Sequence, residues 1–281
     1  MFRIQWAVDI RAEDAGFQQK LIQVLKLLEG QGACVIEPLY VASGDGADRY
    51  GLPASQFETR LEAAFQATGL SSVRPLTSLR SPDLSLSSGV RTLMRYNTRS
   101  RPDLVVCGAH QAKGASHFLV GSFAELLILQ AQTPTVLVTP NTVVPSRFER
   151  AVIVIEGPES LRSLQSLAPL ILHLGIPLEL WASDGQGLLD DAEKDCAQSG
   201  VTCRRVILPH QTTDGILEQA RGGTLFVVQP STDLMTSVAL SNQTKAILNE
   251  ACVPLWVAPL PKPAGLISDE ELRRIAAGGR G

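Results

Sequence analysis

Apolar and polar positions along the chain predict strands and helices that alternate from one end to the other. Short apolar runs indicate buried strands, and longer segments with apolar side chains three and four positions apart indicate helices. The clearest helix spans about 14–31, with one apolar face. That face carries Phe17, Leu21, Val24, Leu25 and Leu28. Alternating strands and helices predict a parallel sheet covered by helices on both faces.

The predicted elements fall into two successive sets. In the first, strands are expected at 2–8, 34–41, 73–79, 104–107 and 135–138, and helices at 14–31, 53–68, 87–99 and from Ser122 to Thr133. In the second, strands are expected at 151–155, 177–182, 202–207, 225–228 and 254–258, and helices up to Leu174 and within 187–199, 213–220 and 241–252. The closing segments 121–134 and 241–254 have the same length, which indicates a duplication.

This repeat predicts two fused domains. We place them at 1–140 and 150–260, joined by a polar linker at 141–149 and followed by a tail at 261–281. The closing strands 135–138 and 255–257 are both apolar and are expected to pair within the chain as a pseudo-dimer, which would remove two sheet edges. A homodimer of the whole chain is compatible with this arrangement.

The stretch 103–140 contains the main candidate chemistry. A buried strand leads into a loop with Gly108, Gly114 and Gly121, and Ser122 then opens an apolar helix. Glycines let backbone N–H groups approach a phosphate, and a helix N-terminus favours an anion. Two alternatives remain open. Gly108 can be a plain tight turn, and Ser122 with Glu125 forms a capping box that stabilises the helix without a ligand.

The same stretch resembles the signature of the universal stress proteins. There a buried strand runs into Gly, two residues, Gly, nine residues and then Gly-Ser or Gly-Thr. Here these positions are Gly108, Gln111, Gly121 and Ser122, so glutamine replaces the second glycine. The resemblance implies two Rossmann-like domains, each an α/β unit with a five-stranded parallel sheet and helices on both faces. It also implies a nucleotide over the ends of the first and fourth strands.

The resemblance extends to further residues of the first half. Asp9 ends the first strand where the family binds the ribose or adenine side, and Val41 ends the second strand where the family contacts adenine. Lys113 in the glycine loop can neutralise phosphate charge. Gln111 has a β-carbon where the family backbone passes the phosphates; its amide can donate to a phosphate or fill the cavity. The implied ligand is ATP, with or without Mg²⁺, or another adenine nucleotide.

The second half has lost this signature. Gln229 stands where Gly108 does, Ser241 and Asn242 replace Gly121 and Ser122, and Glu156 replaces Asp9. Side chains at these points crowd a phosphate, so the second half is not expected to bind a nucleotide in the family's way.

Charge and cysteine content bear on the partners and the location of the protein. A net charge of −3 and a pI near 5.9 argue against a nucleic-acid partner. Five cysteines without a C-x-x-C pair indicate reduced thiols and a cytoplasmic location. Neither a signal peptide nor an apolar run of membrane length is expected. His173, near the end of an apolar helix, is expected to serve packing or capping.

Two functional hypotheses follow. The first is a stress-response protein that binds an adenine nucleotide in its first half for a regulatory purpose, with at most slow ATP hydrolysis because no catalytic motif is present. The second is an interaction module of the same fold that binds an unknown protein partner and needs no cofactor.

Overall fold

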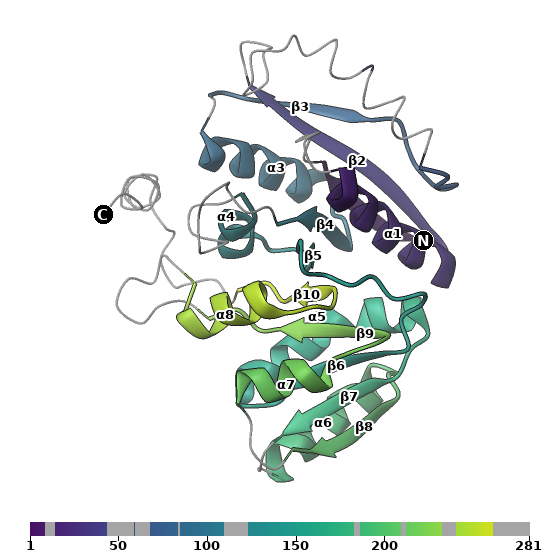
Figure 1. Ribbon diagram of the computed structural model, residues 1–281, viewed down its shortest axis with the longest axis vertical. Helices are drawn as coiled ribbons and strands as arrows, with labels where there is room; N and C mark the ends of the chain where they lie inside the picture. The colour runs from purple at the N-terminus through teal and green to yellow at the C-terminus, as the bar shows by residue number, and fades with distance from the viewer. Residues whose placement is uncertain are drawn as a thin grey trace.

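A computed structural model shows one continuous mixed sheet with helices on both faces (Figure 1). It describes residues 1–8, 15–43, 59, 68–83, 85–109, 123–182, 186–208, 212–231 and 240–260. The sheet has ten strands in the order β3-β2-β1-β4-β5-β10-β9-β6-β7-β8. Read from its centre outward, each half of the sheet has the same strand order, as a duplication would give.

The strands and helices have the following bounds. The strands are β1 Phe2–Ala7, β2 Cys34–Ser43, β3 Thr77–Ser81, β4 Leu104–Gly108, β5 Thr135–Val138, β6 Arg150–Val154, β7 Leu178–Ala182, β8 Cys203–Ile207, β9 Thr224–Val228 and β10 Leu255–Val257. The helices are α1 Ala15–Gln31, α3 Leu86–Ser100, α4 Phe123–Gln130, α5 Pro158–Leu174, α6 Gln186–Gln198, α7 Thr213–Gln219 and α8 Asn242–Glu250.

The two halves join through their closing strands. All pairings within each half are parallel, whereas β5 and β10 pair antiparallel. Val136 pairs with Trp256, and the flanking pairs are Leu137 with Leu255 and Thr135 with Val257. Val136 and Trp256 hold equivalent places in their halves, so a pseudo-twofold axis passes through this pair. The pairing expected of the two closing strands is therefore present in the sheet.

Helices cover the sheet on both faces, which explains why the strands read as continuous apolar runs. One core contains buried side chains of α1, α5 and α6, such as Leu21, Leu167 and Ala192. The other contains side chains of α3, α4, α7 and α8, such as Leu127 and Leu248. The expected fold class, two Rossmann-like α/β units, is confirmed.

The third strand begins later than the sequence indicates. The apolar pattern predicts a strand over 73–79, but β3 spans Thr77–Ser81. Val73 makes an isolated bridge to Ile36, and regular pairing with β2 resumes only at Thr77. Pro75 stands between them and has no N–H to donate, which interrupts the ladder. The helix expected at 53–68 lies outside the described residues, apart from Thr59 and Thr68.

The two halves also pack through α1 and α5. The His173 ring stacks on Phe2 with their centroids 4.4 Å apart, and its Nε2 lies 3.2 Å from the Leu28 carbonyl oxygen. A β-carbon on Gly32 would lie 2.5 Å from the His173 carbonyl oxygen, so glycine permits this close approach. The prediction that His173 serves packing is confirmed.

The connection between the halves is tied to both of them. The Gln31 side chain donates to the Phe148 carbonyl at 3.0 Å and accepts from the Phe148 N–H at 2.9 Å. Asn141 donates to the Asn249 carbonyl at 2.9 Å. These bonds reach from α1 and α8 onto the same connecting segment, so they fix the second half against the first.

Candidate functional site

The carboxyl edge of the first half brings two of the seven predicted site residues together. Ala7, the last residue of β1, pairs with Leu39 of β2 on one side and Cys107 of β4 on the other. Val41 and Gly108 therefore lie just past these pairs, on either side of the end of β1. Ligands of open parallel sheets bind beyond this edge. The other five, Asp9, Gln111, Lys113, Gly121 and Ser122, lie outside the described residues.

Val41 forms part of an apolar wall at this edge. It is half-buried and packs against the core under α3 and α4. A β-carbon on Gly89, in the first turn of α3, would lie 3.9 Å from Val41 Cγ1 and 3.8 Å from Phe123 Cε2. Val41 thus sits close to the first turns of both helices, where an apolar side chain can face a flat ligand.

Gly108 has a steric role that no sequence pattern indicates. A β-carbon there would lie 2.5 Å from Cε1 and 2.7 Å from Cζ of Phe17, and 3.1 Å from Cδ1 of Leu21. Glycine is needed because α1 packs closely on the end of β4. Gly108 is the last residue of β4, pairs with Val138 and is not among the described residues with positive φ. The tight turn considered as an alternative would follow at residues outside the described part of the chain, so it stays a prediction.

The equivalent edge of the second half is closed by a side chain. Gln229 follows β9 as Gly108 ends β4, and its Nε2 donates to the Val154 carbonyl at 2.9 Å, bridging β9 and β6. A cavity of about 50 Å³ remains there, lined in part by Glu156, Thr213 and Gln243. Ligand pockets for drug-sized molecules measure roughly 300–1,000 Å³. Among the described residues, the space beside Gln229 is therefore smaller than pockets of that class.

One ion pair crosses between the halves near the candidate site. Glu125, in the first turn of α4, lies 3.8 Å from Nζ of Lys245 on α8. The Glu125 side chain is 2% exposed and the Lys245 side chain 22%. The sequence pattern predicts Glu125 only as a capping partner of Ser122. The available signal was the repeat itself, because positions 125 and 245 are equivalent and carry opposite charges.

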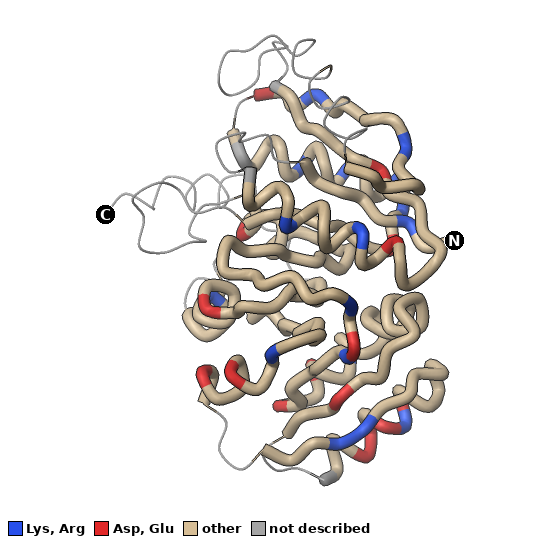
Figure 2. Tube along the Cα trace, turned by 45° about the vertical axis from the view of Figure 1, so that its right-hand side comes forward, with Lys and Arg blue, Asp and Glu red and all other residues tan. Residues whose placement is uncertain are grey.

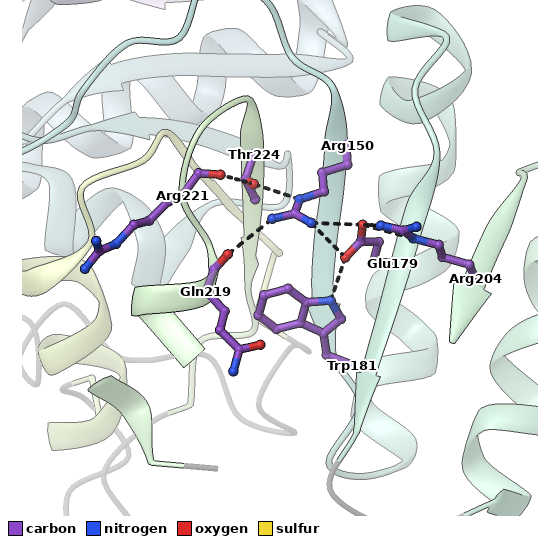
Figure 3. Close-up of polar contacts among 7 residues, drawn as sticks. All are labelled: Arg150, Glu179, Trp181, Arg204, Gln219, Arg221 and Thr224. Carbon is purple, nitrogen blue, oxygen red and sulfur yellow. Dashed lines mark hydrogen bonds and ion pairs between the residues drawn. The ribbon is translucent and has the colours of Figure 1, made fainter. Parts of the chain in front are cut away.

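A second polar cluster lies at the opposite, amino edge of the sheet, under α7 (Figure 3). Glu179 on β7 accepts from Arg150 at 3.1 and 3.3 Å, from Arg204 Nε at 3.0 Å and from Trp181 Nε1 at 2.8 Å. Arg150 also donates to the Gln219 carbonyl at 3.2 Å. Burial alone would raise the pKa of Glu179, but the bonds from Arg204, Trp181 and Arg150 hold it below its ordinary value. These mutual contacts indicate a structural role.

Charges elsewhere are interspersed rather than gathered. Figure 2 shows Lys and Arg mixed with Asp and Glu along both halves of the described chain. Within the described residues, no group of three or more His, Cys, Asp or Glu side chains is arranged to hold a metal ion. None of the described helices is both long enough and apolar enough to span a membrane.

Comparison with known proteins decides the family of the first half. A sequence model of the universal stress protein family matches residues 30–139. These residues form a universal stress protein domain. The match includes Val41, Gly108 and all four signature positions, and it confirms the family suggested by the sequence. No curated protein sequence matches the chain.

Solved structures extend the fold to the whole chain. A universal stress protein from Archaeoglobus fulgidus DSM 4304 superposes with a TM-score of 0.62 at 15% identity, covering 92% of this chain and 98% of that one. A putative universal stress protein from Pseudomonas aeruginosa UCBPP-PA14 gives 0.54 at 12% identity, with coverages of 98% and 96%. Such low identities establish the fold alone. The second half, which the family model does not match, thus shares the architecture.

Proposed function

We propose that this chain is a stress-response protein of the cytoplasm that binds ATP or another adenine nucleotide in its universal stress protein domain. The observation that carries the proposal is the contrast between equivalent strand ends. In the second half Gln229 bridges to Val154 and closes the edge. In the first half Gly108 has no side chain, so nothing from that position crosses to β1.

The surroundings of this edge suit such a ligand. The end of β1 lies between β2 and β4, with the apolar side chain of Val41 to one side. Helix α4 starts at Phe123, directly after the signature, and its N-terminus favours an anion. By resemblance to the family, Asp9 would bind the ribose or adenine side, and Gln111, Gly121 and Ser122 would face the phosphates, with or without Mg²⁺. Lys113, in the same loop, would neutralise phosphate charge.

We propose a regulatory role rather than fast catalysis. A site of this kind supplies backbone N–H groups and a helix N-terminus, which bind phosphate without providing a general base. Hydrolysis, if it occurs, would then be slow, and the bound nucleotide would act as a signal that changes the surface offered to a protein partner.

An interaction module without a nucleotide is the second candidate function. It is favoured by the packing of Phe17 against Gly108, which explains the glycine without a ligand. Under this proposal the domain is kept for a protein partner, and Gln111 fills the space that a phosphate would take.

Calorimetric titration of ATP with Mg²⁺ into the purified chain separates the two candidates. Micromolar binding is expected from the unaltered chain, and Gly121→Val should weaken it at least about tenfold, because a branched side chain obstructs close phosphate approach. Absorbance near 260 nm of the purified protein would report any nucleotide that copurifies.

A matched control keeps the test specific. Gly187→Val makes the same change near the start of α6, where a β-carbon meets nothing within 4 Å. This control should bind ATP like the unaltered chain. The absence of both binding heat and copurified nucleotide would reject the nucleotide proposal in favour of the interaction module.

A further inference from the structure

Glu125 and Lys245 occupy the same position in the two halves. Helices α4 and α8 end alike, since the Ala131 N–H donates to Leu127 and the Ala251 N–H donates to Ile247, each pair 120 positions from the other. Counting back from these ends makes position 245 the equivalent of position 125. The two side chains face each other across the pseudo-twofold axis and form an ion pair of 3.8 Å.

The two charged side chains do not suit their helix positions equally well. Helix N-termini stabilise acidic side chains and disfavour basic ones. Glu125 in the first turn of α4 follows this rule, whereas Lys245, near the start of α8, opposes it. A buried carboxylate requires compensation, and Lys245 provides an opposite charge for Glu125. The lysine is thus better explained by what it does for α4 than by what it does for α8.

The electrostatic consequence falls on the N-terminus of α4. A helix N-terminus is equivalent to roughly half a positive charge. Glu125 is the third residue of α4, so at about 1.5 Å per residue its backbone lies within about 5 Å of the helix start. Its negative charge opposes the helix dipole and would repel a phosphate. The Lys245 ammonium, 3.8 Å away, offsets part of that charge and so favours an anion at the helix start.

We propose that Lys245 is a positioning residue for the nucleotide site of the other half: it neutralises Glu125 so that the N-terminus of α4 can accept a phosphate. This inference rests on the proposed nucleotide function. The second half, in which Gln229 bridges the equivalent edge, would then contribute a residue that supports the nucleotide site of the first half.

The test compares ATP affinity among three variants of the full chain. Lys245→Met keeps the length of the side chain and removes its charge, and should weaken ATP binding on the order of tenfold. Lys245→Arg should bind like the unaltered chain. The double variant Glu125→Gln with Lys245→Met removes both charges, and should regain most of the affinity lost in Lys245→Met.

Controls separate this role from general stability. Lys194→Met removes an exposed lysine that pairs with Asp191 in α6, and should leave ATP affinity unchanged. Urea unfolding midpoints, measured for every variant, show whether affinity merely follows stability.

The outcomes are distinct. If the unaltered chain binds ATP and Lys245→Met binds equally well, the inference is overturned while the proposed function stands. If the double variant is as weak as Lys245→Met, Lys245 acts through packing and the inference is again overturned. If the unaltered chain binds no nucleotide, the proposed function fails and takes this inference with it.

Discussion

Removal of the Glu179 carboxylate should destabilise the chain more than any surface charge change. The Glu179 side chain is 2% exposed and accepts hydrogen bonds from Arg150, Arg204 and Trp181. Glu179→Ala would leave the Trp181 N–H buried without its acceptor and Arg150, whose side chain is 28% exposed, without its counter-charge. Breaking a buried pair from one side costs about 3–5 kcal/mol. We expect a loss of that size in the free energy of unfolding.

Glu179→Gln tests the charge separately from the contacts. Glutamine keeps an acceptor for Trp181 but loses the charge that faces two arginines, so we expect a smaller loss of about 1–3 kcal/mol. Because the folded pKa of Glu179 lies below its ordinary value of about 4.5, the stability it contributes is present above that pH and is lost as the pH falls through the folded value. The difference between Glu179→Gln and the unaltered chain should therefore shrink below about pH 4.5.

Urea unfolding followed by far-ultraviolet circular dichroism measures these losses independently of Trp181, whose fluorescence will respond to the change beside it. Asp191→Ala is the control, because the exposed pair of Asp191 with Lys194 should contribute no more than about 0.5 kcal/mol. If Glu179→Ala lowered the free energy of unfolding as little as this control does, the explanation by buried ion pairing would be refuted.

Three further predictions concern other parts of the chain. Gly108→Ala should lower the free energy of unfolding in urea by about 1–3 kcal/mol, and Phe17→Leu in the same chain should recover part of that loss. An unchanged urea midpoint for Gly108→Ala would contradict the packing explanation. Burial lowers the pKa of His173 despite the nearby Leu28 carbonyl, so stability should fall as the pH drops below about 6.5, and His173→Phe should remove that part of the pH dependence. Iodoacetamide should modify the exposed Cys252 at least about tenfold faster than Cys196, whose pKa burial raises to about 12; equal rates by peptide mass spectrometry would show that Cys196 is accessible.

The strands and helices were predictable because each carries its own signal. Parallel strands buried on both faces appear as unbroken apolar runs, and α1 shows a helical apolar face from Phe17 to Leu28. The repeat also indicated which strands would meet at the centre of the sheet. The start of β3 was placed too early because the apolar pattern continues across Pro75, whose missing N–H interrupts the backbone ladder.

The candidate site was less predictable because its residues depend on distant partners. Gly108 looked like a turn or a phosphate contact, yet its steric neighbour Phe17 lies on another element, far away in sequence. The acceptor of Gln229, the Val154 carbonyl, is likewise distant and belongs to the backbone, which no side-chain pattern reveals. Of the partners of Glu179, Arg150 lies on β6 and Arg204 on β8, so these two become its neighbours only when the sheet assembles, whereas Trp181 lies two residues away on β7 itself.

The two halves of the continuous sheet differ at equivalent positions, and these differences have physical consequences. At the carboxyl edge of the second half, the hydrogen bond from Gln229 to the Val154 carbonyl makes a fixed contact between β9 and β6, for which Gly108 has no counterpart in the first half. The same half gathers the Glu179 cluster at its amino edge and supplies Lys245 to Glu125 across the axis. Since β5 and β10 share backbone hydrogen bonds, the first half would lose both its strand partner and its counter-charge without the second.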